Sequence, residues 1–258
     1  MGSQEPHILV TNDDGITSPG LLALKDVLTE VGQVTVLAPN HNWSASGHVK
    51  TMHKPLRVNE VTLLDGTPAL TTDGAPSDAV ALAFLGIVER PIDMVVSGIN
   101  RGANLGHDVT YSGTVTAAME GVIAGVPAIA VSLNSRSDDD FGVAAGFAAR
   151  LARQVLARGL PEGVLLNVNV PPIPADQIAG VIVTRMGLRI YRDELVRRFD
   201  PRGRPYYWIG GPPPTGVEEE GTDIWAIAHG YISVTPIQLD LTAHEMVDEL
   251  QDWDLSFQ

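Results

Sequence analysis

The N-terminal part of the chain has the pattern of a β-α-β unit, and this unit constrains the fold more than any other stretch. Residues 7–11 (HILVT) form a short apolar run that is typical of a fully buried strand. Ser18 and Pro19 are typical of a helix start, and apolar residues between 21 and 31 recur at helical spacing. A second apolar run follows at 33–38. This order predicts a parallel sheet with a right-handed crossover.

The alternation of strand and helix patterns continues through the first two-thirds of the chain. Further strands are expected at 56–64, 69–72, 92–97, 128–133 and 163–168, and helices at 76–85, 115–124 and 141–156. Polar or glycine-rich loops follow the expected strand ends at Asp13, Pro39 and Ser97. Open α/β sheets bind their ligands at this carboxyl edge. The pattern therefore predicts an α/β fold with a doubly wound, mostly parallel sheet.

The last third of the chain changes character. Strands are expected at 180–191, 205–210 and 226–235, with a closing helix at 243–255. The charged stretch 192–204 separates the first two of these strands, and three aromatic residues follow it at 206–208. An exposed ribbon with aromatic side chains often pairs with another subunit, which suggests an oligomerisation arm. A flap over the functional site is the alternative interpretation.

Charge and composition restrict the partners of the protein. The chain has 258 residues, and 17 Lys and Arg stand against 31 Asp and Glu, for a formal net charge of −14. Because nucleic-acid surfaces need clustered cations, no nucleic-acid polymer is expected as a partner. The absence of cysteine excludes disulfides and thiolate metal sites. No membrane-length apolar run or signal-peptide pattern is present, so a cytoplasmic protein without membrane contact is expected.

Two adjacent acids, Asp13 and Asp14, follow the first strand. Two carboxylates at a strand end repel each other unless a cation lies between them, and oxygen ligands favour a hard divalent ion. Ser44 in the long polar loop and Asn100 after the strand at 92–97 could add neutral oxygens. This set leaves room for water and a phosphate, as Mg²⁺ and Mn²⁺ sites usually do. The alternative is that the Asn-Asp-Asp-Gly sequence is only a turn.

A second candidate feature is the segment 111–114 (YSGT), which stands just before the expected helix at 115–124. Ser or Thr at such a position can cap the helix, and exposed amides at a helix N-terminus also bind phosphate. Phosphoryl transfer needs both an anion site and a metal, so this segment together with the acid pair favours that chemistry. The seven histidines lack metal-binding spacing, and no nucleophile elbow or P-loop sequence occurs.

Several motifs together resemble those of one family, the stationary-phase survival protein SurE nucleotidases. The matching segments are NDDGI at 12–16, APNHNWSA at 38–45, GAPSDAV at 74–80, VSGINRGANLG at 96–106, YSGTVTAAMEG at 111–121 and GYISVTP at 230–236. Their order and spacing cover most of the chain. The resemblance implies a Rossmann-like catalytic core over 1–180 and a C-terminal arm with a closing helix over 181–258, which partly returns to the core sheet.

The same resemblance implies an activity and a set of site residues. The activity is that of a metal-dependent nucleotidase acting on nucleoside 5′- and 3′-monophosphates, with short polyphosphate as a further substrate, in a homodimer or homotetramer. Asp13, Asp14, Ser44 and Asn100 match the ligands of one divalent cation per subunit, Mg²⁺ or Mn²⁺, with Ca²⁺ as a substitute in crystals. Asp13 and Asp14 are also the candidate catalytic residues, of which one would take the proton of the attacking water or attack the phosphorus atom directly. The residues that match the phosphate-binding set are Asn104, Ser112, Gly113 and Thr114.

Two other functions fit parts of the sequence. A signalling receiver domain also places an acid pair after its first strand, binds Mg²⁺ and accepts a phosphoryl group. Such domains are usually much shorter, and the further acid and lysine that they need are not evident here. A non-catalytic nucleotide-binding module is the other alternative, and it would bind nucleotide without turnover.

Overall fold

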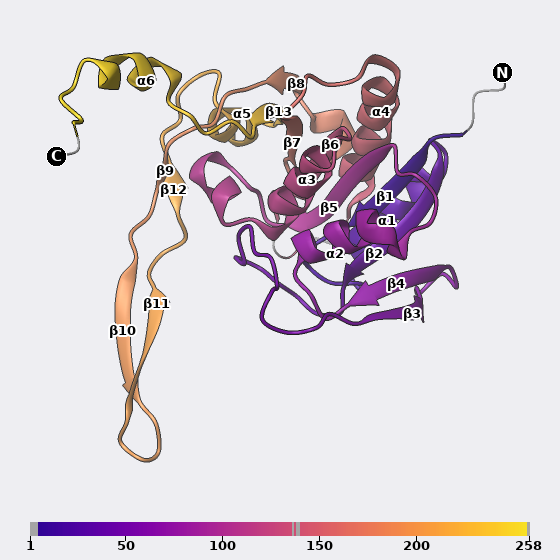
Figure 1. Cartoon of the computed structure of the whole chain (residues 1–258), viewed down its shortest axis with the longest axis horizontal. Helices are drawn as coiled ribbons and strands as arrows, with labels where there is room; N and C mark the ends of the chain where they lie inside the picture. The colour runs from indigo at the N-terminus through magenta and orange to yellow at the C-terminus, as the bar shows by residue number, and fades with distance from the viewer. Residues whose placement is uncertain (1–4, 136, 138–139, 257–258) are drawn as a thin grey trace.

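The computed structural model describes residues 5–135, 137 and 140–256, and it shows a large central sheet flanked by helices (Figure 1). Nine of the strands in this part of the chain form one sheet. Their order is β3 (Val58–Thr62), β4 (Pro68–Thr72), β2 (Gln33–Pro39), β1 (His7–Thr11), β5 (Met94–Arg101), β6 (Ala128–Leu133), β7 (Val164–Val170), β13 (Tyr231–Gln238) and β8 (Gly180–Val183). In this order, all neighbouring strands from β4 through β2, β1, β5 and β6 to β7 are parallel. Strand β3 is antiparallel to β4, and β13 is antiparallel to β7. The predicted doubly wound, mostly parallel sheet is confirmed.

Helices cover both faces of the sheet. The helices are α1 (Pro19–Leu28), α2 (Pro76–Leu82) with a π-helical extension η1 (Ala83–Ile87), α3 (Gly113–Ile123), α4 (Gly142–Arg158), α5 (Asp223–Ala228) and α6 (His244–Gln251), with short 3₁₀ turns η2 (Gly106–Thr110) and η3 (Ala175–Gln177). On β1, Ile8 and Val10 pack in one core with α1 and α4, and Leu9 packs in another with α2 and α3. Burial on both faces explains why this strand is continuously apolar.

The expected strand at 226–235 is wrong in its first half. Residues 223–228 form α5, and β13 begins only at Tyr231. The helix is capped by Thr222, whose Oγ1 accepts a hydrogen bond from the amide of Trp225 at 3.2 Å. Gly230, with a φ of 76°, then breaks the apolar run between helix and strand. Apolar residues lie on both sides of this boundary, in α5 and in β13, so hydrophobicity alone did not separate the helix from the strand.

Two other expectations for the last third also need correction. The expected strand at 180–191 is divided into β8 and a short β9 (Arg189–Ile190), which pairs with β12 (Thr215–Gly216). The charged stretch 192–204 contains β10 (Glu194–Phe199), which pairs with β11 (Pro205–Gly210). Its charges concealed the strand because both faces of this hairpin are exposed to solvent, so no apolar alternation is required.

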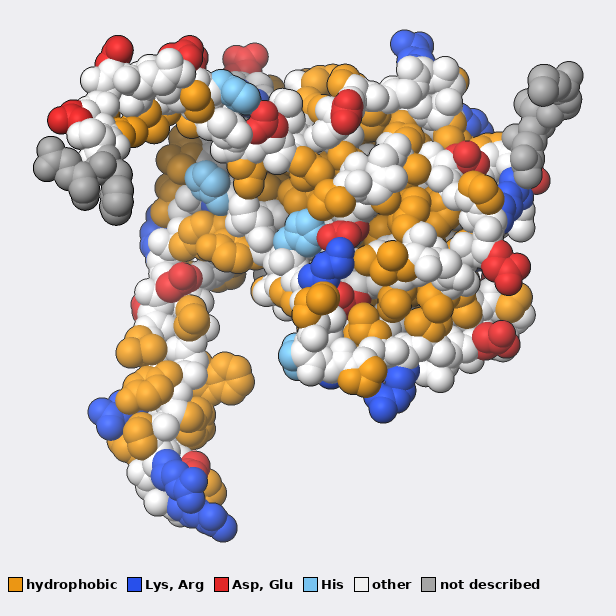
Figure 2. Space-filling view, in the orientation of Figure 1, with side chains coloured by type: hydrophobic (Ala, Val, Ile, Leu, Met, Phe, Trp, Pro, Cys, Tyr) orange, Lys and Arg blue, Asp and Glu red, His pale blue; other side chains and the backbone are white. Residues whose placement is uncertain are grey.

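The β10–β11 hairpin extends far from the α/β body, and β9 and β12 form its base (Figure 1). Its side chains include large apolar groups in open solvent, such as Leu195, Trp208 and Ile209 (Figure 2). We call residues 184–217 the arm. Within the described ranges, no helix is both long enough and apolar enough to cross a membrane.

Candidate active site

One cleft of about 540 Å³ opens at the carboxyl ends of β1 and β5, and it gathers most of the residues that the sequence singled out. Six of the predicted site residues line it: Asp13, Asp14, Ser44, Asn100, Asn104 and Ser112. Gly113 and Thr114 lie directly behind Asp13 at the start of α3. Lining residues that the sequence analysis did not select include Asn42, Arg101, Asp108, Arg189 and Pro214. The hairpin strands β10 and β11 contribute no lining residue, so the hairpin does not cover the cleft of its own chain.

Asp13 is the most buried acid of the cleft, with 3% of its surface exposed. The hydroxyl of Thr114 donates to its Oδ1, and the amide of Trp43 donates to its backbone oxygen at 2.7 Å. Burial raises the pKa of Asp13 to about 6, and the neighbouring charge of Asp14 acts in the same direction, against the hydrogen bond from Thr114. Asp13 is therefore held rigidly in a position where its negative charge is poorly solvated.

Asp14 is half-buried beside it and receives two hydrogen bonds. The amide of Arg101 donates to Oδ2 at 3.1 Å, and Nδ2 of Asn42 donates to Oδ1 at 3.2 Å. Burial also raises the pKa of Asp14, while the contact with Arg101 opposes the shift. A bound cation would stabilise the ionised forms of these two adjacent carboxylates and so lower their raised pKa values.

The neutral oxygens of the cleft fit a hard divalent cation. Ser44 is exposed, and its amide donates to Oδ1 of Asn42 at 2.7 Å. Nδ2 of Asn100 donates to the carbonyl of Gly102 at 2.8 Å, which leaves the side-chain oxygen of Asn100 as its free acceptor. No group of three or more His, Cys, Asp or Glu side chains that could hold a metal occurs in the parts of the chain that the structure describes. Two carboxylates with neutral oxygens match Mg²⁺ or Mn²⁺ better than zinc. These four residues remain candidate ligands.

The start of α3 combines a helix cap with a close approach to Asp13. Ser112 caps the helix, because its Oγ accepts from the amide of Val115 at 3.1 Å. A Cβ atom at Gly113 would lie 2.7 Å from Cβ of Asp13, so this contact requires glycine. Thr114 is fully buried, and its hydroxyl is committed to Asp13. Any contact with phosphate from Thr114 would therefore have to come from its backbone, and the phosphate role of the segment stays a prediction.

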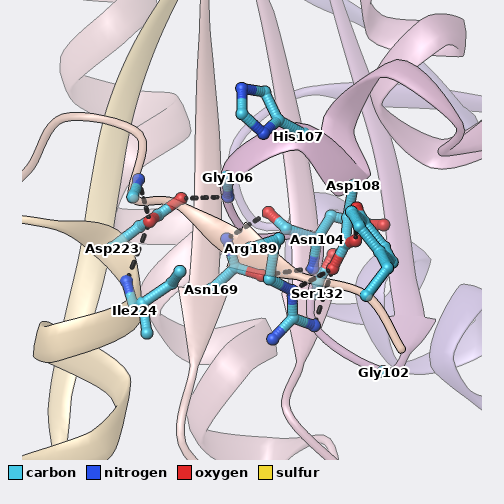
Figure 3. A network of polar contacts seen from close by, with 12 residues as sticks. Gly102, Asn104, Gly106, His107, Asp108, Ser132, Asn169, Arg189, Asp223 and Ile224 are labelled. Carbon is cyan, nitrogen blue, oxygen red and sulfur yellow. Dashed lines mark hydrogen bonds and ion pairs between the residues drawn. The ribbon is translucent and has the colours of Figure 1, made fainter. Parts of the chain in front are cut away.

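Asn104 is fixed by polar side chains of the central sheet (Figure 3). Its amide donates to Oδ1 of Asn169 at 2.8 Å, and its Nδ2 donates to Oγ of Ser132 at 2.8 Å. Its carbonyl accepts from Nδ2 of Asn167 at 2.9 Å and of Asn169 at 3.0 Å. The sequence analysis missed these partners, although two asparagines in the otherwise apolar strand 164–170 were a visible signal.

The base of the arm forms one wall of the cleft. Nε of Arg189 donates to Oδ2 of Asp108 at 2.6 Å, and the hydroxyl of Tyr191 donates to Oδ1 of the same carboxylate at 2.6 Å. Burial and the charge of Asp108 raise the pKa of Tyr191 to about 12, so Tyr191 stays a hydrogen-bond donor at neutral pH. No local pattern indicated these contacts, because Asp108 and Arg189 are 81 residues apart.

The raised pKa of Asp13 predicts a stability effect in the metal-free protein. Asp13→Asn should raise the free energy of unfolding by up to about 3 kcal/mol at pH 7.5 and by about half as much at pH 5. The pKa of about 6 in the folded chain lies above the ordinary 3.8, so ionisation of Asp13 destabilises the fold by an amount that grows between these two pH values and is complete above pH 6. This penalty declines as the pH falls toward 3.8. Urea unfolding in EDTA at both pH values measures it, and a less stable variant at pH 7.5 would contradict the assignment.

Known proteins resemble this chain over most of its length. A family model described as "Survival protein SurE" matches residues 8–193. A protein named 5'-nucleotidase SurE from Chloroflexus aggregans is 56% identical over 250 residues, which cover 96% of this chain and 99% of that protein. Another of that name from Herpetosiphon aurantiacus is 55% identical over 246 residues, covering 95% of this chain and 96% of that protein.

A solved structure agrees with these sequence matches. The crystal structure of the SurE protein from Aquifex aeolicus has a TM-score of 0.81 and 41% identity to this chain. The match covers 95% of this chain and 98% of the other. Fold, motifs and sequence identity over nearly the whole length lead to one conclusion: the chain belongs to the SurE family.

Proposed function

We propose that the protein is a divalent-cation-dependent nucleotidase. In this proposal it hydrolyses nucleoside 5′- and 3′-monophosphates to nucleoside and phosphate, and it also acts on short polyphosphate. Relatives that are about half identical carry the name 5'-nucleotidase SurE, which supports the reaction class. The observation that carries the proposal is the pair of poorly solvated carboxylates, Asp13 and Asp14, in one cleft with the N-terminus of α3.

The residues of the cleft have separate roles in this proposal. Asp13, Asp14, Ser44 and Asn100 would hold the cation, which when bound supplies Lewis-acid polarisation of the phosphoryl group and a more acidic water. Thr114 orients Asp13 through its hydroxyl.

The phosphate would lie against the first turn of α3. The cap at Ser112 fixes that turn, so the amides of 112–114 would stabilise charge on the phosphoryl oxygens. Asn104, held by Ser132 and Asn169, would donate the second N–H of its side-chain amide, directly or through a bound water, to the same substrate. Most of the catalytic effect in this proposal is electrostatic and depends on groups held in place before the substrate arrives.

A phosphate-release screen tests the proposal. The protein is incubated with 5′- and 3′-nucleoside monophosphates and tripolyphosphate in Mg²⁺ or Mn²⁺, and phosphate is measured with malachite green. We expect steady release that stops with EDTA and returns when excess Mn²⁺ is added. Release that is equally fast in EDTA would contradict the metal dependence. Binding of AMP by calorimetry without any turnover would instead support a binding module, and stable phosphorylation by a small phosphodonor would support a phospho-acceptor.

The nucleophile can be identified in the same preparation. A single turnover in ¹⁸O-labelled water places the label in the released phosphate if water attacks the phosphorus atom directly. The label also enters phosphate if a carboxylate of Asp13 or Asp14 attacks first and water then cleaves the P–O bond of the aspartyl phosphate. The deciding observation is therefore whether acid quenching traps an aspartyl phosphate during turnover.

We also infer that the protein is a homodimer or homotetramer that associates through the arm. The support is the unusual exposure of large apolar side chains on both strands of the hairpin (Figure 2).

A further inference from the structure

The loop 102–106, which carries Asn104 into the cleft, is fastened at its far end by a buried carboxylate outside the cleft. Asp223 is the first residue of α5 and is fully buried. Its Oδ2 accepts from the amide of Gly106 at 2.8 Å (Figure 3). Its Oδ1 accepts from the amides of Gly187 at 2.7 Å and Ile224 at 2.8 Å. One side chain thus joins the cleft loop, the arm and α5.

Apolar packing surrounds the same junction. Leu105 of the cleft loop forms a small buried cluster with Ile224 and Ile227 of α5. The backbones of Gly106 and Gly187 are so close that a Cβ at Gly106 would lie 2.3 Å from the carbonyl oxygen of Gly187. The loop and the base of the arm therefore touch directly, and Asp223 occupies the point where they meet.

The loop is also anchored to the sheet, where Ser132, Asn167 and Asn169 all form hydrogen bonds with Asn104. Asn169 of β7 holds both the amide and the carbonyl of Asn104. Because Asn169 fixes the loop at residue 104 and Asp223 fixes it at residue 106, neither residue can shift without losing hydrogen bonds. Buried polar groups that lose their partners are costly, so both contacts are strong constraints.

We propose that Asp223 is a positioning residue of the active site, which sets the cleft loop and its Asn104 by binding that loop to the base of the arm. This inference rests on the proposed function only for its kinetic consequence. A small displacement of a substrate-contacting group lowers the rate strongly, even when the altered residue is remote from the reacting atoms. The cleft would accordingly reach its working geometry only when the base of the arm is in place.

The chemistry of this site explains why a carboxylate is needed. All three partners of Asp223 are amide donors, so both of its oxygens must accept. An asparagine of the same shape has one acceptor oxygen. If that oxygen keeps the amides of Gly187 and Ile224, the Nδ2 group faces the amide of Gly106 and that hydrogen bond is lost. Asp223→Asn should therefore release the cleft loop specifically.

Kinetics provide the first test. We expect Asp223→Asn to lower kcat/KM for a nucleoside monophosphate by about tenfold to a hundredfold. The affinity for Mn²⁺, measured by calorimetry without substrate, should change less than about threefold, because Asp13 and Asp14 keep their own partners. The control is Val155→Ala, a buried truncation in α4 that removes core volume from another region. It should lower the melting temperature and leave kcat/KM unchanged.

Hydrogen exchange tests the inference without any turnover. In Asp223→Asn, a peptide over 102–110 should exchange about tenfold faster or more at its protected amide, while a peptide over 184–190 changes little. If the variant does not fold, Gly187→Ala serves instead, because its Cβ would lie 3.0 Å from Oδ1 of Asp223 and would displace the carboxylate whose Oδ2 accepts from Gly106. The peptide over 102–110 should again exchange faster.

The outcomes distinguish the positioning role of Asp223 from the proposed nucleotidase function. Unchanged exchange over 102–110, or unchanged kcat/KM in a folded Asp223→Asn protein that unfolds at a lower temperature, would overturn the positioning role. A loss of activity equal to that of Val155→Ala at the same loss of stability would also overturn it. If the wild-type protein releases no phosphate from any nucleotide, the proposed function fails, and the exchange experiment still decides whether Asp223 orders the loop.

Discussion

Asp13→Asn and Asp14→Asn should each lower kcat by about 10²-fold to 10³-fold, the usual cost of losing one preorganised electrostatic group. In both variants the cleft keeps its shape, because asparagine has nearly the volume of aspartate and can still accept the hydrogen bonds from Thr114 or Arg101. What is lost is negative charge at the place where the cation would bind. The measurement is phosphate release at saturating Mn²⁺ and substrate, with circular dichroism to verify the fold.

The control for this experiment is Asp176→Asn in η3, an exposed acid outside the cleft, which should retain wild-type turnover. The double variant Asp13→Asn with Asp14→Asn should lose little more than the worse single variant, because the two carboxylates act on one ion and their effects are not additive. Turnover near the wild-type value in either folded single variant would refute the role of the pair.

These acids could be found in the sequence because their setting is local. The strand His7–Thr11, the acid pair and the following helix are contiguous, and each element is identifiable from spacing alone. The candidate metal ligands also lie at or just beyond the carboxyl ends of neighbouring parallel strands, so the topology rule that brings such ends together was sufficient to group them. The same rule explains why Asn100 and Asp14 line one cleft although they are far apart in the chain.

The support of the cleft loop could not be found in this way. Asp223 bonds Gly106 across 117 residues, and Asn169 bonds Asn104 across 65. In the sequence, Thr222 and Asp223 only resemble a helix start, and this interpretation was missed because the following residues also fit a strand. Periodicity identifies which face of an element is buried, but it does not identify the partner of a buried polar side chain. That information exists only in the three-dimensional structure.

The arm shows a different limit of pattern reasoning. The cross-strand partners Leu195 and Ile209 lie on one face of the hairpin, and Phe199 and Tyr207 lie on the same face. Arg197 covers the rings of Phe199 and Tyr207 at 4.9 and 5.9 Å. A face of this kind in open solvent has no stabilising role within one chain, since a two-stranded hairpin is marginal by itself. Packing against a second copy of the chain would bury this apolar face and stabilise the hairpin.

Charge favours the same partner. The chain is strongly acidic, with a formal net charge of −14, whereas cationic side chains gather near the tip of the hairpin (Figure 2). They belong to the arginines at 197, 198, 202 and 204. A basic arm on an acidic body is electrostatically complementary to the body of an identical chain. Salt should therefore weaken the association by screening these charges, although the apolar contacts remain.

Replacing Leu195 and Ile209 together with serine should weaken self-association by about 10²-fold or more, because burial of each such side chain contributes about 1.5–3 kcal/mol. Exposed fractions of 73% and 83% in the single chain mean that nearly the whole side chain is available for burial by a partner. Sedimentation velocity over a range of protein concentrations measures the shift toward monomer. Leu64→Ser is the matched control, since Leu64 is also 83% exposed but lies outside the arm. If the double variant sediments like the wild type, or the wild type is a monomer throughout, the hairpin is not the association surface.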